Sequence, residues 1–125
     1  MNILFVYFDK IIQNDNLYVK SLCEEIRRQN GSIECSIDAF WNSTRKYDIV
    51  HIQFPEVIFK WRQPSDNGLK ALRQRIDRLK SMGTKIVYTR HDAIPHYCTD
   101  KNKLELYRIV ETQSNAIIHL GEYSR

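Results

Sequence analysis

The sequence predicts an α/β domain of the Rossmann-like type, a three-layer α/β/α arrangement around a mainly parallel sheet of about five strands. Short apolar segments rich in β-branched and aromatic residues alternate with longer segments in which apolar residues recur every three or four positions. Strands that alternate with helices form parallel sheets through right-handed crossovers. The 125 residues, 42% of them hydrophobic, suit a single domain that needs no disulfide to fold.

Three strands and one helix are predicted in the first half of the chain. Residues 3–8 are an almost unbroken apolar run, typical of a strand buried on both faces. Residues 16–29 predict a helix, because their apolar residues fall on one helical face. Residues 33–40 alternate as a strand does, and residues 47–54 form a further strand that ends at Pro55.

The second half of the chain predicts two helices and two strands. Residues 69–82 carry leucine, isoleucine and methionine at steps of three and four, which indicates an amphipathic helix. Residues 85–89 form a strand, and residues 101–113 form a helix with Asp100 as its amino-terminal cap. Residues 116–120 are the last strand. The predicted order is therefore β-α-β-β-α-β-α-β.

The cysteines and histidines argue against metal and disulfide chemistry. Cys23, Cys35 and Cys98 are odd in number and lack a C-x-x-C spacing, so we expect reduced thiols in the cytoplasm. The first residues lack the basic leader of a signal peptide. His91 and His96 are five positions apart, which does not suit a helical pair of zinc ligands. We expect neither a metal nor a cofactor.

The net charge of +4 is concentrated in one part of the chain. Nine lysines and arginines lie between Ile58 and Arg90, and several belong to the predicted helix from Leu69 to Met82. The cations of this helix can form a solvated face. Alternatively, they can hold the protein loosely at the inner surface of an anionic membrane, where each cation contributes about 1 kcal/mol to binding. Nucleic acid is not an expected partner, because aromatic residues do not interleave with the basic ones.

Polar and aromatic residues follow the predicted strands at their carboxyl ends. Ligands of open parallel sheets bind at this edge, near the point where the strand order reverses. The candidate residues there are Asp9, Phe54, Glu56, Trp61, His91, Asp92, Gly121 and Glu122. Phe54 and Trp61 suit stacking on a sugar while Glu56 accepts its hydroxyls, and the alternative is a hydrophobic plug over the sheet edge.

Three segments together resemble the amino-terminal domain of glycosyltransferases of the GT-B fold. They are residues 47–56 (YDIVHIQFPE), 85–92 (KIVYTRHD) and 116–125 (AIIHLGEYSR). The similarity covers essentially the whole chain and is closest to the retaining family 4. It implies that this chain binds a sugar or lipid-linked acceptor. A carboxyl-terminal domain, absent from this chain, would bind the nucleotide-sugar donor, so the chain alone is expected to be inactive.

The resemblance also implies roles for individual residues. His91 is the expected catalytic residue, since an imidazole can donate to a sugar hydroxyl or a phosphate oxygen, and Asp92 would orient it. The alternative for His91 is a histidine bonded only to loop backbone. The expected acceptor-binding residues are Asp9, Phe54, Glu56, Trp61 and Asp92. Gly121 and Glu122 would lie near the donor.

The chain departs from this family in its first loop. Residues 9–16 contain no glycine where the family commonly has a Gly-Gly pair, so we do not expect this loop to approach the donor diphosphate. The rival interpretation is a non-catalytic α/β interaction or regulatory module. A phosphate-receiver version of that module would need an acidic cluster, but Asp9 is a single acid at the end of the first strand.

Overall fold

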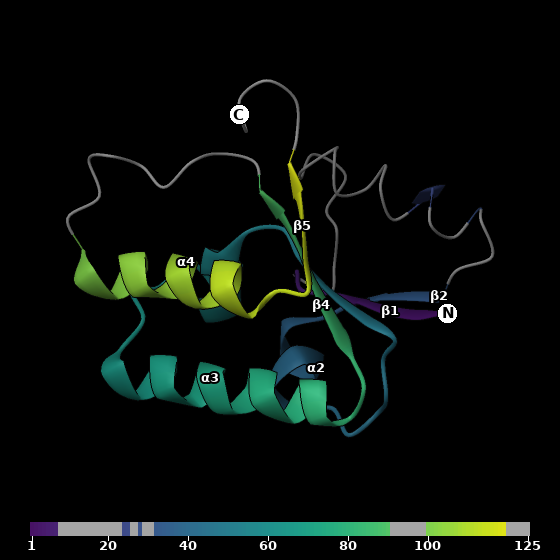
Figure 1. The fold of residues 1–125 in the computed structure, drawn as a ribbon, viewed down its shortest axis with the longest axis horizontal. Helices are drawn as coiled ribbons and strands as arrows, with labels where there is room; N and C mark the ends of the chain where they lie inside the picture. Colours follow the sequence, from purple (N-terminus) through teal and green to yellow (C-terminus); the bar gives the residue numbers. More distant parts are fainter. Residues whose placement is uncertain (8–23, 26–27, 29–31, 91–99, 120–125) are drawn as a thin grey trace.

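The computed structural model describes residues 1–7, 24–25, 28, 32–90 and 100–119 (Figure 1). Its strands are β1 (Asn2–Phe5), β2 (Ser32–Cys35), β3 (Ile49–Ile52), β4 (Lys85–Arg90) and β5 (Ala116–His119). Its helices are α2 (Ile37–Asn42), the 3₁₀ helix η1 (Pro55–Phe59), α3 (Asp66–Ser81) and α4 (Lys101–Gln113).

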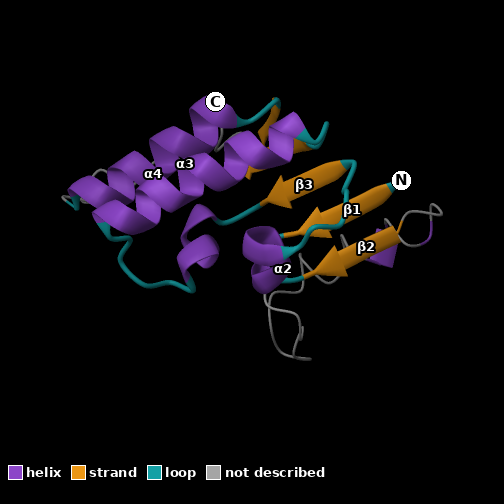
Figure 2. Cartoon of the chain, turned by 90° about the horizontal axis from the view of Figure 1, so that it is seen from below, coloured by secondary structure: helices purple, strands orange, loops and turns teal. Residues whose placement is uncertain are grey.

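The strands form a five-stranded sheet in the order β2-β1-β3-β4-β5, and every neighbouring pair is parallel. This confirms the predicted Rossmann-like α/β class. Helices α3 and α4 lie side by side on one face of the sheet, and α2 lies on the same side (Figure 2). The helix predicted over residues 16–29 falls largely outside the described residues.

The prediction of a continuous strand over residues 33–40 is wrong. Strand β2 ends at Cys35, and α2 begins after Ser36, whose Oγ accepts a hydrogen bond from the backbone N–H of Ala39 at 2.9 Å. Serine at this position satisfies a backbone donor that a helix start leaves without an intrahelical partner. The short helix is the crossover that brings β3 back parallel to β1.

The other described elements agree with the predicted ones within a few residues. Strand β3 lies inside the predicted range 47–54, and α3 begins three positions before its predicted start because Ser65 caps it through the N–H of Gly68. Helix α4 has the predicted bounds. The carboxylate of Asp100 accepts from the N–H groups of Asn102 and Lys103, which confirms the predicted cap.

The core lies mainly between the sheet and the helices on its one described side. Alternate residues of β1 and its continuation point to opposite faces, as the period of a strand requires. Leu4 and Val6 belong to the large cluster beneath α3 and α4, whereas Phe5 and Tyr7 pack on the other face with Val57. The edge near β1 and β3 therefore has buried aromatic residues on the face opposite α3.

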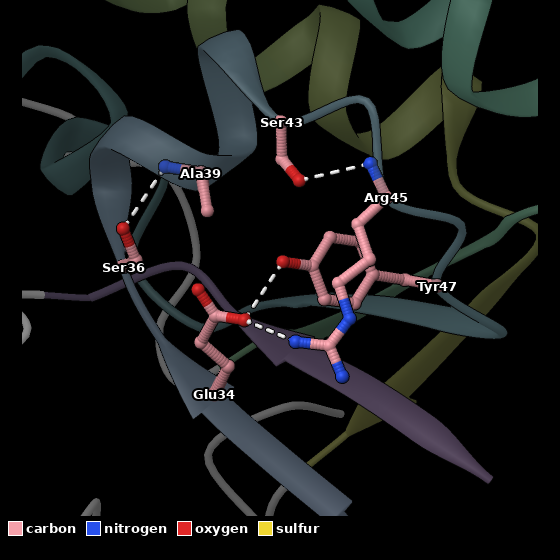
Figure 3. Close-up of polar contacts among 6 residues, drawn as sticks. All are labelled: Glu34, Ser36, Ala39, Ser43, Arg45 and Tyr47. Carbon is pink, nitrogen blue, oxygen red and sulfur yellow. Dashed lines mark hydrogen bonds and ion pairs between the residues drawn. The ribbon is translucent and has the colours of Figure 1, made fainter.

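Polar contacts tie the segment after α2 to β2 (Figure 3) and to α3. Glu34 of β2 accepts from the Tyr47 hydroxyl at 2.9 Å and from Arg45 at 3.1 Å. Burial raises the pKa of the Tyr47 phenol above its usual value, and the bond to Glu34 acts in the same direction. Arg75 of α3 donates to the carbonyl oxygen of Ser43 at 2.8 Å.

In the part of the chain that the structure describes, no helix is long and apolar enough to cross a bilayer.

Candidate functional site

The strand order reverses between β1 and β3, so their carboxyl ends mark the edge where ligands of this fold class bind. The two strands stay paired up to this edge, since the N–H of Val6 donates to the carbonyl of His51 at 3.0 Å. Beyond it, β1 leads to Tyr7, and β3 leads through Gln53 to Phe54. These residues form the described part of the candidate site.

Four aromatic side chains run from the buried sheet face to the surface at this edge, and we call them the aromatic row: Phe5, Tyr7, Phe54 and Trp61. Successive ring centroids are 6.4, 6.5 and 6.0 Å apart. Phe5 is fully buried, whereas Trp61 is 50% exposed. Because Trp61 contacts Phe54 and is still half exposed, it presents an apolar surface to solvent.

The backbone at the end of η1 holds Trp61 in place. Lys60 and Trp61 both have left-handed backbone conformations, with φ of 55° and 64°. Each such residue costs about 1–2 kcal/mol when it carries a side chain. Hydrogen bonds offset this cost, because the N–H of Trp61 donates to the carbonyl of Glu56 at 2.9 Å and that of Lys60 donates to Val57 at 2.8 Å.

Polar residues lie beside the buried end of the aromatic row. His51 of β3 and Thr89 of β4 are both buried, and the His51 Nε2 lies 2.5 Å from the Thr89 hydroxyl oxygen. The His51 ring meets Phe5 edge to face, with centroids 5.0 Å apart. His51 is thus a buried histidine of the sheet.

Glu56 is held towards α4. Its Oε1 accepts from the Tyr107 hydroxyl at 2.5 Å, and its Oε2 lies 3.8 Å from the Lys103 ammonium. Tyr107 and Lys103 are one helical turn apart, so α4 presents both to the same carboxylate. The Glu56 side chain as a whole is 27% exposed.

Replacement of Tyr107 by phenylalanine tests this arrangement. We expect the free energy of unfolding to fall by about 1 kcal/mol, because the change removes a hydrogen bond to a charged, partly buried acceptor. Urea denaturation measures the effect. Lys103→Met is the matched comparison and should cost less, about 0.5 kcal/mol or below, since its ion pair is long and partly exposed. A larger loss for Lys103→Met than for Tyr107→Phe would contradict the arrangement.

Several predicted site residues fall outside the described residues: Asp9, His91, Asp92, Gly121 and Glu122. Their roles remain predictions. Arg90, which immediately precedes His91, ends β4 and forms an ion pair with Glu111 of α4 at 3.6 Å. Among the predicted residues, the structure thus describes Phe54, Glu56 and Trp61, and it brings Phe54 and Trp61 together.

The sequence reasoning missed Tyr7, Lys103 and Tyr107 as members of this edge. Tyr7 lies within an apolar run that predicts a buried strand, so the sequence did not mark it as an edge residue. Lys103 and Tyr107 carried a usable signal, because two polar groups four positions apart share one face of a predicted helix. What the sequence alone did not provide was the side of α4 that faces η1.

The basic helix α3 presents fewer outward cations than its composition suggested. Arg75 lies against carbonyl groups of α2, and burial, followed by the neighbouring Arg78, lowers its pKa. Arg73 pairs with Glu105 of α4 at 2.7 Å. These contacts favour the interpretation of α3 as a packed helix with a solvated outer face.

Within the described ranges, no group of three or more histidine, cysteine, aspartate or glutamate side chains is placed to hold a metal ion.

The fold and the edge residues define the class of protein: a Rossmann-like parallel α/β domain with an aromatic surface at its strand-order reversal. No known protein family, curated protein or solved structure matches this chain. The function is therefore argued from the chemistry of the edge itself.

Proposed function

We propose that this chain is the acceptor-binding half of a glycosyltransferase. The full enzyme would transfer a sugar from a nucleotide-sugar donor to a glycan or lipid-linked acceptor during polysaccharide or glycoconjugate synthesis. The observation that carries the proposal is the half-exposed indole of Trp61, supported by Phe54 at the carboxyl end of β3. This is the edge at which parallel α/β sheets bind their ligands.

The chemistry of this edge suits a saccharide. A sugar ring has an apolar C–H face and a rim of hydroxyls, so it needs a flat apolar surface and nearby polar groups. Trp61 supplies the surface. Glu56, five positions earlier and held by Tyr107, has a partly exposed side chain whose carboxylate can accept hydroxyl hydrogens.

The proposal assigns the remaining roles to residues that the structure does not describe. His91 would donate a hydrogen bond to the transferring sugar, with Asp92 as its orienting partner, and Asp9 would complete the acceptor side. Gly121 and Glu122 would lie towards the donor. A second domain would hold the nucleotide sugar, so this chain is proposed to bind acceptor without transferring sugar. Peripheral contact of α3 with an anionic membrane would suit a lipid-linked acceptor.

One observation favours the rival function of an interaction module. Strand β5 is at the edge of the described sheet, and Ile118 on it is 46% exposed. An open strand edge with an exposed apolar side chain is a surface to which an extended peptide can add. Under this alternative, Trp61 would contact a protein.

Tryptophan fluorescence distinguishes the two functions, because the chain has two tryptophans in different settings. Trp61 is half exposed. The Trp41 indole N–H donates to the Ile58 carbonyl at 3.1 Å, and the Trp41 ring packs on Phe40. Trp41→Phe therefore leaves Trp61 as the only reporter. We expect oligosaccharides to change its emission in a saturable way.

The matched control is Trp61→Phe, which leaves Trp41 as the reporter and should respond little to the same sugars. A panel of neutral and acidic oligosaccharides that leaves the Trp61 emission unchanged would count against the proposed function. An equal response from both single-tryptophan proteins would place binding away from the aromatic row and would also count against it.

A further inference from the structure

We infer that the saccharide bound at the aromatic row carries a negative charge, as a carboxylate or a phosphate group. This inference rests on the proposed function and names the class of acceptor. It follows from the charged side chains around Trp61, which the aromatic argument for sugar binding does not use.

Two cations flank Trp61 in the chain. Lys60 and Arg62 are both exposed, and neither side chain has a hydrogen-bond or ion-pair partner among the described residues. Two other exposed arginines are paired, since Arg45 pairs with Glu34 and Arg73 pairs with Glu105. Lys60 and Arg62 are therefore available to an anion that approaches the indole.

The described acidic groups in η1 and at the starts of α3 and α4 each have a polar partner. Glu56 accepts from Tyr107 and has Lys103 nearby, so a cation of α4 offsets its charge. Asp66 lies in the first turn of α3 and accepts from the Asn102 amide at 3.1 Å, and Asp100 caps α4. Carboxylates at helix starts are partly balanced by the positive end of the helix dipole.

The two residues next to Trp61 in the chain are both cationic, and their chemistry suits a bound anion. A guanidinium such as Arg62 can donate two parallel hydrogen bonds to a carboxylate or a phosphate. The backbone at Lys60 and Trp61 is left-handed and is held by hydrogen bonds to η1. It therefore restricts the positions from which the side chains on either side of Trp61 extend. A saccharide stacked on Trp61 would thus bring an acidic substituent within reach of these two cations.

The test uses the Trp41→Phe protein and three probes: tetragalacturonate, its neutral methyl ester, and glucose 1-phosphate. The ester keeps the sugar rings and removes the charge. We expect the acid to bind about tenfold more tightly than the ester at low salt, because only the acid can form ion pairs with the two exposed cations. About 0.5 M salt should remove most of this preference. Comparison with glucose 1-phosphate distinguishes carboxylate from phosphate recognition.

The variant Lys60→Gln/Arg62→Gln should lose the preference for the charged probes and keep its affinity for the ester. Arg78→Gln/Lys85→Gln is the control, since it removes the same charge from the last turn of α3 and the start of β4. This control should retain the preference. Circular dichroism of both variants checks that they remain folded.

The outcomes separate the inference from the proposed function. Equal affinity for the acid and the ester, with Trp61 responding to both, would overturn the inference and leave the acceptor-binding function standing. No response to any of the three probes or to the wider oligosaccharide panel would overturn both. A response of Trp61 to anionic lipid vesicles alone would also overturn both and would identify the edge as a membrane contact.

Discussion

Replacement of Phe40 by alanine is expected to lower the free energy of unfolding by about 3–5 kcal/mol, the usual cost of removing a large buried ring. Phe40 is fully buried in the cluster beneath α3, and its ring meets Trp41 edge to face at 5.3 Å. Its backbone carbonyl also accepts from Arg75. The loss is a large part of the roughly 5–15 kcal/mol that stabilises a typical domain.

Urea denaturation followed by circular dichroism measures this effect. Asn42→Ala is the matched control in the same helix, because Asn42 is exposed and bonds only to the neighbouring exposed Asp38 among the described residues. It should change the stability by about 0.5 kcal/mol or less. Similar small losses for Phe40→Ala and Asn42→Ala would mean that α2 does not pack as described.

Replacement of Trp61 by alanine is expected to have the largest effect on ligand binding. A tryptophan at the centre of a binding site typically contributes 2 kcal/mol or more, which corresponds to an affinity loss of about 30-fold. Isothermal titration with an oligosaccharide that binds the parent protein measures the loss. Calorimetry is required here because the substitution removes the fluorescent reporter.

Stability should change little in Trp61→Ala, because half of the side chain is already exposed. Two further substitutions serve as controls for the affinity loss. Trp61→Phe should retain much of the affinity, since it keeps an aromatic face. Leu104→Ala should retain all of it, because Leu104 is an exposed apolar residue of α4 and is not part of the aromatic row. Full affinity in Trp61→Ala would favour the alternative that Phe54 and Trp61 form a hydrophobic plug over the sheet edge.

The sequence predicted the fold well because parallel α/β domains depend on repeated local patterns. Long amphipathic periodicity located α3 and α4, and a side-chain cap located the start of α4 at Asp100. The error over residues 33–40 arose because α2 has six residues, too few to establish a helical period. Ser36 with Asp38 two positions later was the available signal for a helix start.

The site was predictable only in part. Placement of polar residues after strands identified Phe54 and Glu56 as edge residues, because strand ends can be located from hydrophobic pattern. The ring contact between Tyr7 and Phe54 depends on the pairing of β1 with β3, which no local pattern encodes. The bond from Tyr107 to Glu56 likewise spans 51 positions and depends on how α4 packs against η1.

Saccharide binding at the edge formed by Tyr7, Phe54 and Trp61 can be observed directly by ¹H–¹⁵N NMR of the unmodified chain. The two indole N–H signals report separately, since that of Trp41 is bonded inside the fold to Ile58. On titration with an acidic oligosaccharide, we expect a saturable shift of the Trp61 indole signal and of the Phe54 amide, with the Trp41 signal unchanged. Absence of any shift at Trp61 and Phe54, or shifts confined to β5 and α3, would mean that the saccharide does not bind at this edge.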